Sequence, residues 1–156
     1  MSNNLILTGF SGTGKSHVGS IVAELTGLEF IDTDERISLM VGKPISDIFN
    51  DHGERHFRDL EEKVIRDACA SSNVVISTGG GSVASSENRT AMTEGGFVVC
   101  LEASVETIVN RMEKSGKAYP MLDDGDKILN IKTLKSARQQ YYSWANWTIH
   151  TDDMAP

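Results

Sequence analysis

The fold of this chain is decided near its N-terminus by the stretch Gly9-Phe10-Ser11-Gly12-Thr13-Gly14-Lys15-Ser16. It follows the pattern G-x-x-x-x-G-K-[ST], whose glycines let the backbone curl until successive N–H groups point at phosphate oxygens. Lys15 supplies a positive charge for the terminal phosphates, and the Ser16 hydroxyl is a candidate ligand for Mg²⁺. A glycine-rich turn that binds nothing is the alternative, but the eight-residue pattern is far more specific than such a turn. The stretch therefore predicts a binding site for a nucleoside triphosphate.

The residues on either side of this P-loop support that interpretation. Leu5-Ile6-Leu7 before it is a short apolar run that predicts a buried strand, and residues 17–26 after it carry apolar side chains at helical spacing. A helix that begins within the motif turns the positive end of its dipole towards the phosphates. The order strand, glycine-rich loop, helix is the one that phosphate binding requires.

Short apolar strands alternate with helical patterns along the rest of the chain. We expect strands at residues 5–8, 29–32, 73–77, 96–101 and 147–150, and helices at residues 15–26, 34–41, 46–51, 53–71, 87–93, 104–113 and 128–144. This alternation predicts an α/β fold with a mostly parallel sheet covered by helices on both faces. Ligands bind beyond the carboxyl ends of the strands in such sheets. We therefore expect the P-loop, Asp32 with Asp34, and the run Gly79-Gly80-Gly81 to meet along one rim.

The composition restricts the possible partners. The 156 residues suffice for one core, and acidic residues outnumber basic ones by 22 to 15, which argues against a nucleic-acid-binding surface. No apolar run approaches the roughly 20 residues that span a bilayer, and no basic region leads to a cleavage site. We expect a cytoplasmic protein with no nucleic-acid or membrane partner, in which Cys69 and Cys100 are reduced and buried.

Two carboxylates follow the second predicted strand, in Asp32-Thr33-Asp34. A carboxylate near a transferring phosphoryl group can hold Mg²⁺ through water or accept the proton of an attacking hydroxyl. The alternative is a structural role, in which one of the two caps the helix that follows. The pair is compatible with both interpretations.

Two arginines are candidates for binding an anionic substrate. Arg58 lies three residues before Glu61 on a helical face, and a carboxylate that holds an arginine prepares it to bind another carboxylate bidentately. An ordinary exposed ion pair is the alternative for Arg58, and a solvated side chain is the alternative for Arg138. The pair His52 and His56 has no evident third ligand, so we do not expect a metal there.

Together these motifs resemble the shikimate kinase family, and the resemblance covers essentially the whole chain. It is carried by residues 9–16, Asp32-Thr33-Asp34, Gly53-Glu54 with Phe57-Arg58 and Glu61, Gly79-Gly80-Gly81, and Arg138 followed by Tyr141 and Ala145. The resemblance implies a three-layer P-loop kinase of the nucleoside-monophosphate-kinase type with about five parallel strands. It also implies a substrate-binding segment at about residues 33–60 and a mobile lid at about residues 112–124. The implied reaction is Mg²⁺-dependent transfer of the γ-phosphoryl of ATP to the 3-hydroxyl of shikimate, in chorismate and aromatic amino acid biosynthesis, by a monomer.

The same resemblance implies roles for individual residues. It assigns the nucleotide to Gly12, Thr13, Gly14, Lys15, Ser16 and His17, to Arg111, which packs on adenine, and to Pro156 in the adenine loop. It assigns Mg²⁺ to Ser16 and Asp32, the substrate hydroxyls to Asp34 and to the backbone of Gly79, Gly80 and Gly81, and the substrate carboxylate to Arg58 and Arg138. Lys15 and Asp32 are the implied catalytic residues.

The lid departs from the family pattern. The family carries Arg-Pro-Leu-Leu, whose arginine reaches the transferring phosphoryl group, whereas this chain has Tyr119-Pro120-Met121-Leu122. Tyrosine does not supply the missing charge, and such arginines contribute about 10³–10⁵ in rate. Our hypothesis is that Lys117 takes this catalytic role, with Lys114 as the alternative.

Two other functions remain open on these motifs. A gluconate-kinase-like enzyme shares the small P-loop scaffold, although the paired arginines favour shikimate. A catalytically impaired homologue that binds nucleotide or shikimate is suggested by Tyr119 and by the end of the chain. Residues 152–156 are similar to the lead-in of a helix, so we expect one domain of residues 1–156 from which a C-terminal helix is missing.

Overall fold

The computed structural model describes residues 3–155. Its strands are β1 (Leu5–Thr8), β2 (Glu29–Asp32), β3 (Val74–Ser77), β4 (Phe97–Glu102) and β5 (Trp147–His150). They form one sheet in the order β2-β3-β1-β4-β5, and every neighbouring pair is parallel. The five-stranded parallel sheet expected from the sequence is confirmed.

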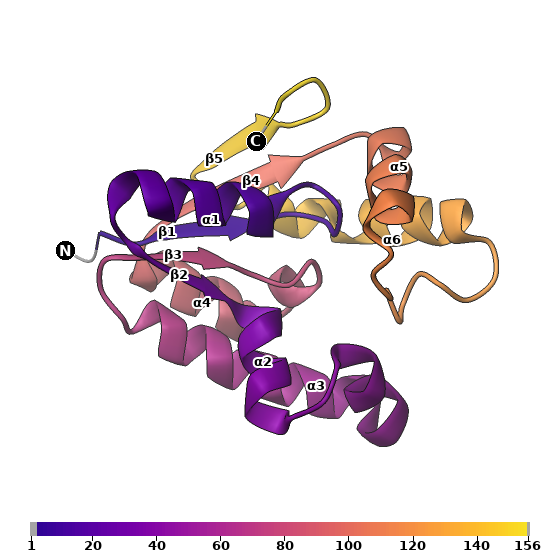
Figure 1. The fold of residues 1–156 in the computed structure, drawn as a ribbon, viewed down its shortest axis with the longest axis horizontal. Coiled ribbons are helices and arrows are strands. Elements are labelled where there is room, and N and C mark those ends of the chain that lie inside the picture. Colours follow the sequence, from indigo (N-terminus) through magenta and orange to yellow (C-terminus); the bar gives the residue numbers. More distant parts are fainter. Residues whose placement is uncertain (1–2, 156) are drawn as a thin grey trace.

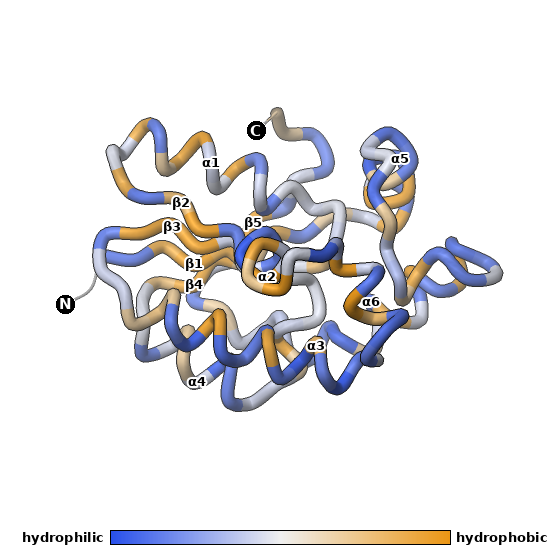
Figure 2. The backbone as a smooth tube through the Cα atoms, turned by 60° about the horizontal axis from the view of Figure 1, so that its bottom comes forward, coloured by the Kyte–Doolittle hydropathy of each residue, from blue (hydrophilic) through white to orange (hydrophobic). Residues whose placement is uncertain are grey.

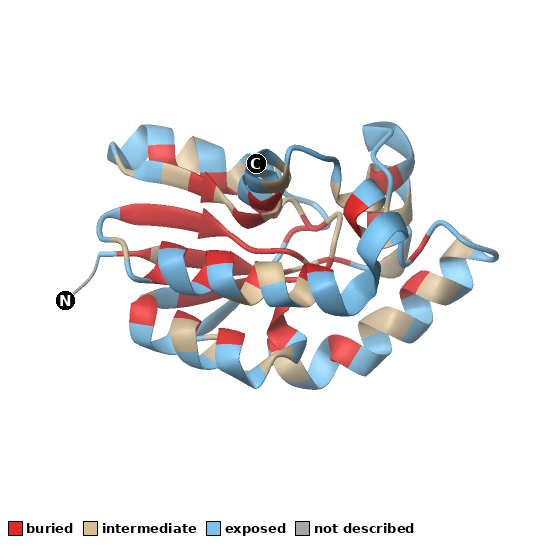
Figure 3. Ribbon diagram, turned by 90° about the horizontal axis from the view of Figure 1, so that it is seen from below, coloured by how far each residue is buried: buried red, intermediate tan, exposed pale blue. Residues whose placement is uncertain are grey.

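Helices cover both faces of this sheet (Figures 1 and 2). They are α1 (Lys15–Thr26), α2 (Thr33–Val41), α3 (Ile45–Cys69), α4 (Ser86–Gly95), α5 (Val105–Ser115) and α6 (Lys127–Tyr142), with a short 3₁₀ helix, η1 (Ser82–Ala84). Successive residues of β1 point to opposite faces of the sheet. Ile6 packs in a core cluster with residues of α3 and α4, whereas Leu7 packs with α1 on the other face. Figure 3 shows the same division, with buried positions facing the sheet and exposed positions facing outwards.

Parallel register brings the carboxyl ends of the strands to one edge. Asp32 of β2 pairs with Ser77 of β3, and Thr8 of β1 pairs with Cys100 of β4. Figure 1 shows α5, α6 and the loop between them beyond the ends to which the strand arrows point. The segments that the sequence placed on one rim therefore meet at this edge.

Two helix boundaries bear on the expectations. Residues 46–51 and 53–71 were expected as separate helices, and α3 indeed consists of two helical segments that meet at a kink. Gly53 interrupts that element with φ 81° and ψ 172°, so the change of direction falls close to the expected break. The helix α2 begins at Thr33, because Asp32 is its N-cap and accepts hydrogen bonds from the N–H groups of Asp34 and Glu35.

Cys69 and Cys100 are buried free thiols, as expected. Within residues 3–155, no helix has both the length and the apolar character needed to span a bilayer.

Candidate active site

The P-loop curls because its glycines adopt a left-handed backbone. Gly12 and Gly14 have φ of 80° and 100°, and α1 begins directly afterwards at Lys15. A Cβ atom at Gly9 would collide with the carbonyl oxygen of Leu101, so this position also requires glycine. The loop therefore presents the amino end of α1 to the space beyond β1, as a phosphate site requires.

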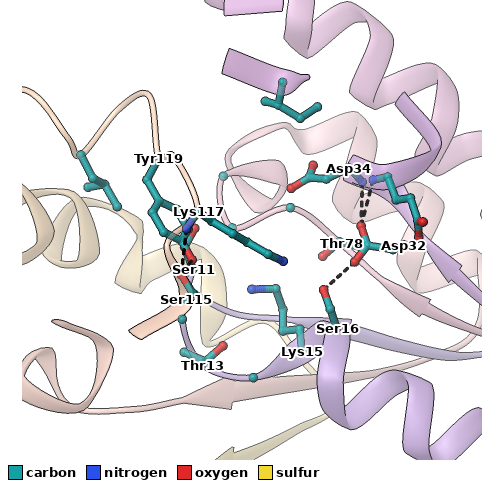
Figure 4. Close-up of a pocket in the computed structure, with 18 of the residues that line it drawn as sticks. Ser11, Thr13, Lys15, Ser16, Asp32, Asp34, Thr78, Ser115, Lys117 and Tyr119 are labelled. Carbon is teal, nitrogen blue, oxygen red and sulfur yellow. Dashed lines mark hydrogen bonds between the residues drawn. The ribbon is translucent and has the colours of Figure 1, made fainter. Parts of the chain in front are cut away.

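Lys15 is buried against the loop that precedes it. Its Nζ donates a hydrogen bond to the carbonyl oxygen of Phe10 at 2.9 Å, and 8% of the residue is exposed. Burial lowers the pKa of Lys15 to about 8, although the carboxylates of Asp34 and Asp32 oppose that fall. The ammonium group lies at the base of the site with these two carboxylates close by (Figure 4).

The two carboxylate oxygens of Asp32 have different hydrogen-bond partners. Its Oδ1 accepts hydrogen bonds from the backbone N–H groups of Asp34 at 3.0 Å and Glu35 at 3.1 Å. Its Oδ2 accepts a hydrogen bond from the Ser16 hydroxyl at 2.5 Å. The capping interpretation is therefore correct for Asp32, and the other oxygen remains available at the P-loop beside Ser16.

Asp34 has an oxygen without a partner. Its Oδ1 is buried and makes no hydrogen bond among the residues that the structure describes. Burial first, and the neighbouring Asp32 second, raise the pKa of Asp34 to about 6, while Lys15 and Arg58 oppose the rise. This oxygen lies against the glycine run, since a Cβ atom at Gly79 would be 2.9 Å from it.

Arg58 is held by a buried carboxylate and is not part of an ordinary surface pair. Its Nη1 donates to Glu61 Oε1 at 2.8 Å, and the Glu61 side chain is 1% exposed. Burial raises the pKa of Glu61, and the neighbouring Arg58 opposes this rise. The second oxygen of Glu61, Oε2, is also buried without a hydrogen-bond partner in the described part of the chain.

Arg138 is likewise buried, which rules out the alternative of a solvated side chain. The residue is 7% exposed, and its guanidinium lies 5.5 Å from the centroid of the Phe10 ring. Both guanidinium groups lie against Gly81, since a Cβ atom there would contact Arg58 Nη2 and would lie 2.8 Å from Arg138 Nη2. Arg58 and Arg138 therefore face one point in the site.

One cavity of about 1090 Å³ connects these groups. It is lined by every predicted site residue within 3–155: Gly12, Thr13, Gly14, Lys15, Ser16, His17, Asp32, Asp34, Arg58, Gly79, Gly80, Gly81, Arg111, Lys117 and Arg138. Pro156, the remaining predicted residue, lies outside the described residues. A single cavity thus brings together a phosphate loop, two carboxylates and two paired arginines.

Arg111 ties three segments together at the edge of the cavity. Its guanidinium donates to the carbonyl oxygens of Thr13 at 3.2 Å and Thr151 at 2.5 Å, and to the Thr151 hydroxyl at 2.9 Å. Thr151 also donates to the Thr13 carbonyl oxygen at 3.0 Å. No local sequence pattern marks Thr151, because its contact depends on how the end of β5 meets the P-loop.

The loop between α5 and α6 places a lysine in the cavity. Figure 4 shows the Lys117 side chain directed towards the space between Lys15 and Asp34. The positive charge of Lys117 is close enough to help lower the pKa of Asp34. The Tyr119 hydroxyl instead lies 3.3 Å from Ser115 Oγ, within this loop.

Met121 of the same loop was not recognised as a site residue from the sequence. Its Sδ lies 3.6 Å from Arg58 Nη2 and 3.7 Å from Arg138 Nη2. No local pattern marks this position, because the contact joins three segments distant in the sequence.

Comparison with known proteins gives a consistent result. The family model described as shikimate kinase matches residues 11–156. Shikimate kinases from Caldicellulosiruptor bescii and Persephonella marina are 41% and 42% identical to this chain, over 98% of it and 88% and 92% of their own lengths.

Solved structures agree with the sequence comparison. A shikimate kinase from Acinetobacter baumannii in complex with shikimate has a TM-score of 0.92 at 33% identity, over 99% of this chain and 87% of that one. A gluconokinase from Sinorhizobium meliloti shares the fold, with a TM-score of 0.56 at 21% identity, over 99% of this chain and 85% of that one. This chain belongs to the shikimate kinase family.

Proposed function

We propose that this protein transfers the γ-phosphoryl group of ATP to the 3-hydroxyl of shikimate and releases shikimate 3-phosphate and ADP. The observation that carries the proposal is that Arg58 and Arg138 converge at Gly81 in the same cavity as Lys15. Membership of the shikimate kinase family supports the same pair of substrates. The place of the reaction would be aromatic amino acid biosynthesis, in the cytoplasm, with the protein acting as a monomer.

The P-loop would bind the nucleotide. The backbone N–H groups from Gly12 to Ser16 would hold the phosphates, with His17 beside them and Arg111 towards the adenine. Lys15 would exchange its hydrogen bond to the Phe10 carbonyl oxygen for the β- and γ-phosphates. Phosphate charge near a lysine favours its ammonium form, so ATP would raise the lowered pKa of Lys15.

Ser16 and Asp32 would hold Mg²⁺. Their side-chain oxygens are neighbours at the P-loop, and Mg²⁺ prefers oxygen ligands from one or two protein groups together with phosphates and water. When bound, Mg²⁺ neutralises negative charge on the phosphate oxygens. The donor set present here fits that ion.

The part of the cavity around Arg58 and Arg138 suits a small hydroxylated carboxylate. Arg58 and Arg138 provide two guanidinium groups for the carboxylate, and the glycine run from Gly79 to Gly81 lets backbone N–H groups approach the ring. The Asp34 carboxylate lines the cavity and would accept a hydrogen bond from a substrate hydroxyl, and it is ionised at neutral pH because its pKa is about 6.

Lys117 would supply the positive charge that Tyr119 does not. Its side chain points into the cavity between the carboxylates and the P-loop lysine (Figure 4). A cation at this place can stabilise charge on the transferring phosphoryl group and thereby lower the barrier.

The test is ADP release with ATP and Mg²⁺, in parallel reactions with shikimate, gluconate and no acid. We expect ADP formation that depends on both shikimate and Mg²⁺, and none above background with gluconate. Shikimate binding without ADP formation would instead identify an impaired homologue, and turnover of gluconate would contradict the proposed substrate.

A further inference from the structure

Met121 places its sulfur at the point where the proposed function puts the substrate carboxylate. The sulfur contacts one Nη2 atom from each arginine, at 3.6 Å from Arg58 and 3.7 Å from Arg138. A thioether is only a weak hydrogen-bond acceptor, so an anionic substrate would displace it easily. Met121 is nevertheless 38% exposed, which leaves it accessible to small solutes.

We propose that Met121 is a site of oxidation by hydrogen peroxide, and that its sulfoxide latches the loop onto Arg58 and Arg138 and excludes the substrate carboxylate. This inference rests on the proposed function for its effect on shikimate, but not for the latch itself. It makes the site sensitive to oxidants through a residue of the lid segment.

The chemistry needs only peroxide as co-reactant. A sulfur lone pair of Met121 attacks one peroxide oxygen, the S–O bond forms and the O–O bond breaks. The departing hydroxide takes the proton from the transferred oxygen and leaves as water. Sulfur loses two electrons and peroxide gains them, which gives methionine sulfoxide, a product that sulfoxide reductases reverse.

The sulfoxide oxygen would accept hydrogen bonds from two guanidinium groups that are already in position. Both guanidinium groups are held in place before the reaction, Arg58 by Glu61 and Arg138 by the ring of Phe10. Hydrogen bonds from charged donors are roughly twice as strong as neutral ones. The weak contact of the thioether thus becomes a strong one, directed at the same two groups that would hold the substrate.

Among the other sulfur atoms of the described chain, only that of Met154 is both exposed, at 58%, and part of a residue that lines the cavity, so Met154 needs its own control variant. Burial raises the pKa of both Cys69 and Cys100 to about 12, which keeps them as unreactive thiols. Met92 and Met112 are 0% and 1% exposed. Met40, on α2, is 46% exposed and does not line the cavity, so it provides a matched control.

The experiment treats the full chain with hydrogen peroxide, locates sulfoxides by peptide mass mapping, and measures KM for shikimate and for ATP. In the wild type we expect the KM for shikimate to rise about tenfold, equivalent to about 1.4 kcal/mol, with little change in the KM for ATP. Treatment with sulfoxide reductases should restore the original value. M40L and M154L should respond to peroxide as the wild type does, whereas M121L should not respond. M121Q, whose amide oxygen imitates the sulfoxide, should have a raised KM without peroxide.

An equal response of M121L and wild type to peroxide, or complete oxidation of Met121 without a change in KM, would overturn the proposal. A second readout does not need shikimate: trypsin cleavage after Lys117 should slow on oxidation of the wild type but not of M121L. If the untreated protein fails to phosphorylate shikimate, the proposed function fails and the cleavage rates decide the latch. Equal cleavage rates before and after oxidation would then rule the latch out.

Discussion

Arg58 and Arg138 bring their guanidinium groups together against the backbone of Gly81, although they belong to different helices, α3 and α6. Two like charges repel each other: burial lowers the pKa of Arg138, and the neighbouring Arg58 adds to this fall. Such an arrangement is favourable when an anion binds between the two groups. The pair therefore indicates a carboxylate site more strongly than either arginine does alone.

Glu61 positions Arg58 for this role. Replacing Glu61 with Gln keeps the shape of the side chain but removes the charge that holds Arg58 Nη1 at 2.8 Å. Hydrogen bonds to charged groups contribute about 1.5–3 kcal/mol, so we expect the KM for shikimate to rise at least about tenfold. Steady-state kinetics at saturating ATP measure the change.

Glu54 offers the matched control for that prediction. Its Oε1 lies 3.4 Å from Arg58 Nε, but its side chain is 50% exposed. Exposed ion pairs contribute about 0–1 kcal/mol, so E54Q should change the KM by less than about fivefold. Equal effects of E54Q and E61Q would show that the buried pair has no special role.

Lys117 should matter for the chemical step. Replacing it with Ala removes a cation that points into the cavity, and we expect kcat to fall about 100-fold or more. Lys114, in the same part of the chain but outside the cavity lining, provides the control K114A. A change in turnover of less than about threefold in K117A, a fraction of a kcal/mol, would rule out the role of Lys117.

Asp34 should lower the stability of the folded protein at neutral pH, although it is needed for activity. Burial raises its folded-state pKa from 3.8 to about 6, so between these values the folded protein binds more protons than the unfolded chain. The free energy of unfolding therefore falls as the pH rises through this window, and the loss persists above it. Asn carries no charge, so D34N should be more stable than the wild type by about 1–3 kcal/mol at pH 7.5 while losing activity.

Urea denaturation at several pH values tests this expectation. The advantage of D34N should shrink towards zero as the pH falls to about 4, where the carboxyl is protonated in both states. Asp59, on α3, is exposed, so D59N should show no comparable pH-dependent gain. A D34N protein that is less stable than the wild type at pH 7.5 would contradict the account.

The sequence predicted those features that depend on local signals. The glycine pattern located the P-loop, apolar runs located the strands, and the rule that ligands bind at the carboxyl ends of parallel strands placed Asp32 and Gly79 on one rim. The capping role of Asp32, one of its two predicted roles, is confirmed, and its other oxygen accepts a hydrogen bond from Ser16. Its role at Mg²⁺ stays a prediction.

Side-chain packing between distant segments was not predictable in this way. Arg138 is buried over Phe10, and Glu61 is almost fully enclosed, yet the sequence left a solvated Arg138 and an exposed ion pair of Arg58 with Glu61 open as alternatives. The position of the Met121 sulfur depends on where a loop meets α3 and α6, which no pattern within the loop encodes.

The central claim is that two guanidinium groups hold a carboxylate beside the phosphate loop. The most direct measurement compares kcat/KM for shikimate with that for its methyl ester, which lacks the charge, in the wild type and in R138A. Because each hydrogen bond to a charged group contributes about 1.5–3 kcal/mol, the wild type should prefer the acid by about 100-fold or more. In R138A the preference should fall at least about tenfold. The same preference in both proteins would show that Arg138 does not bind the carboxylate and would contradict the account.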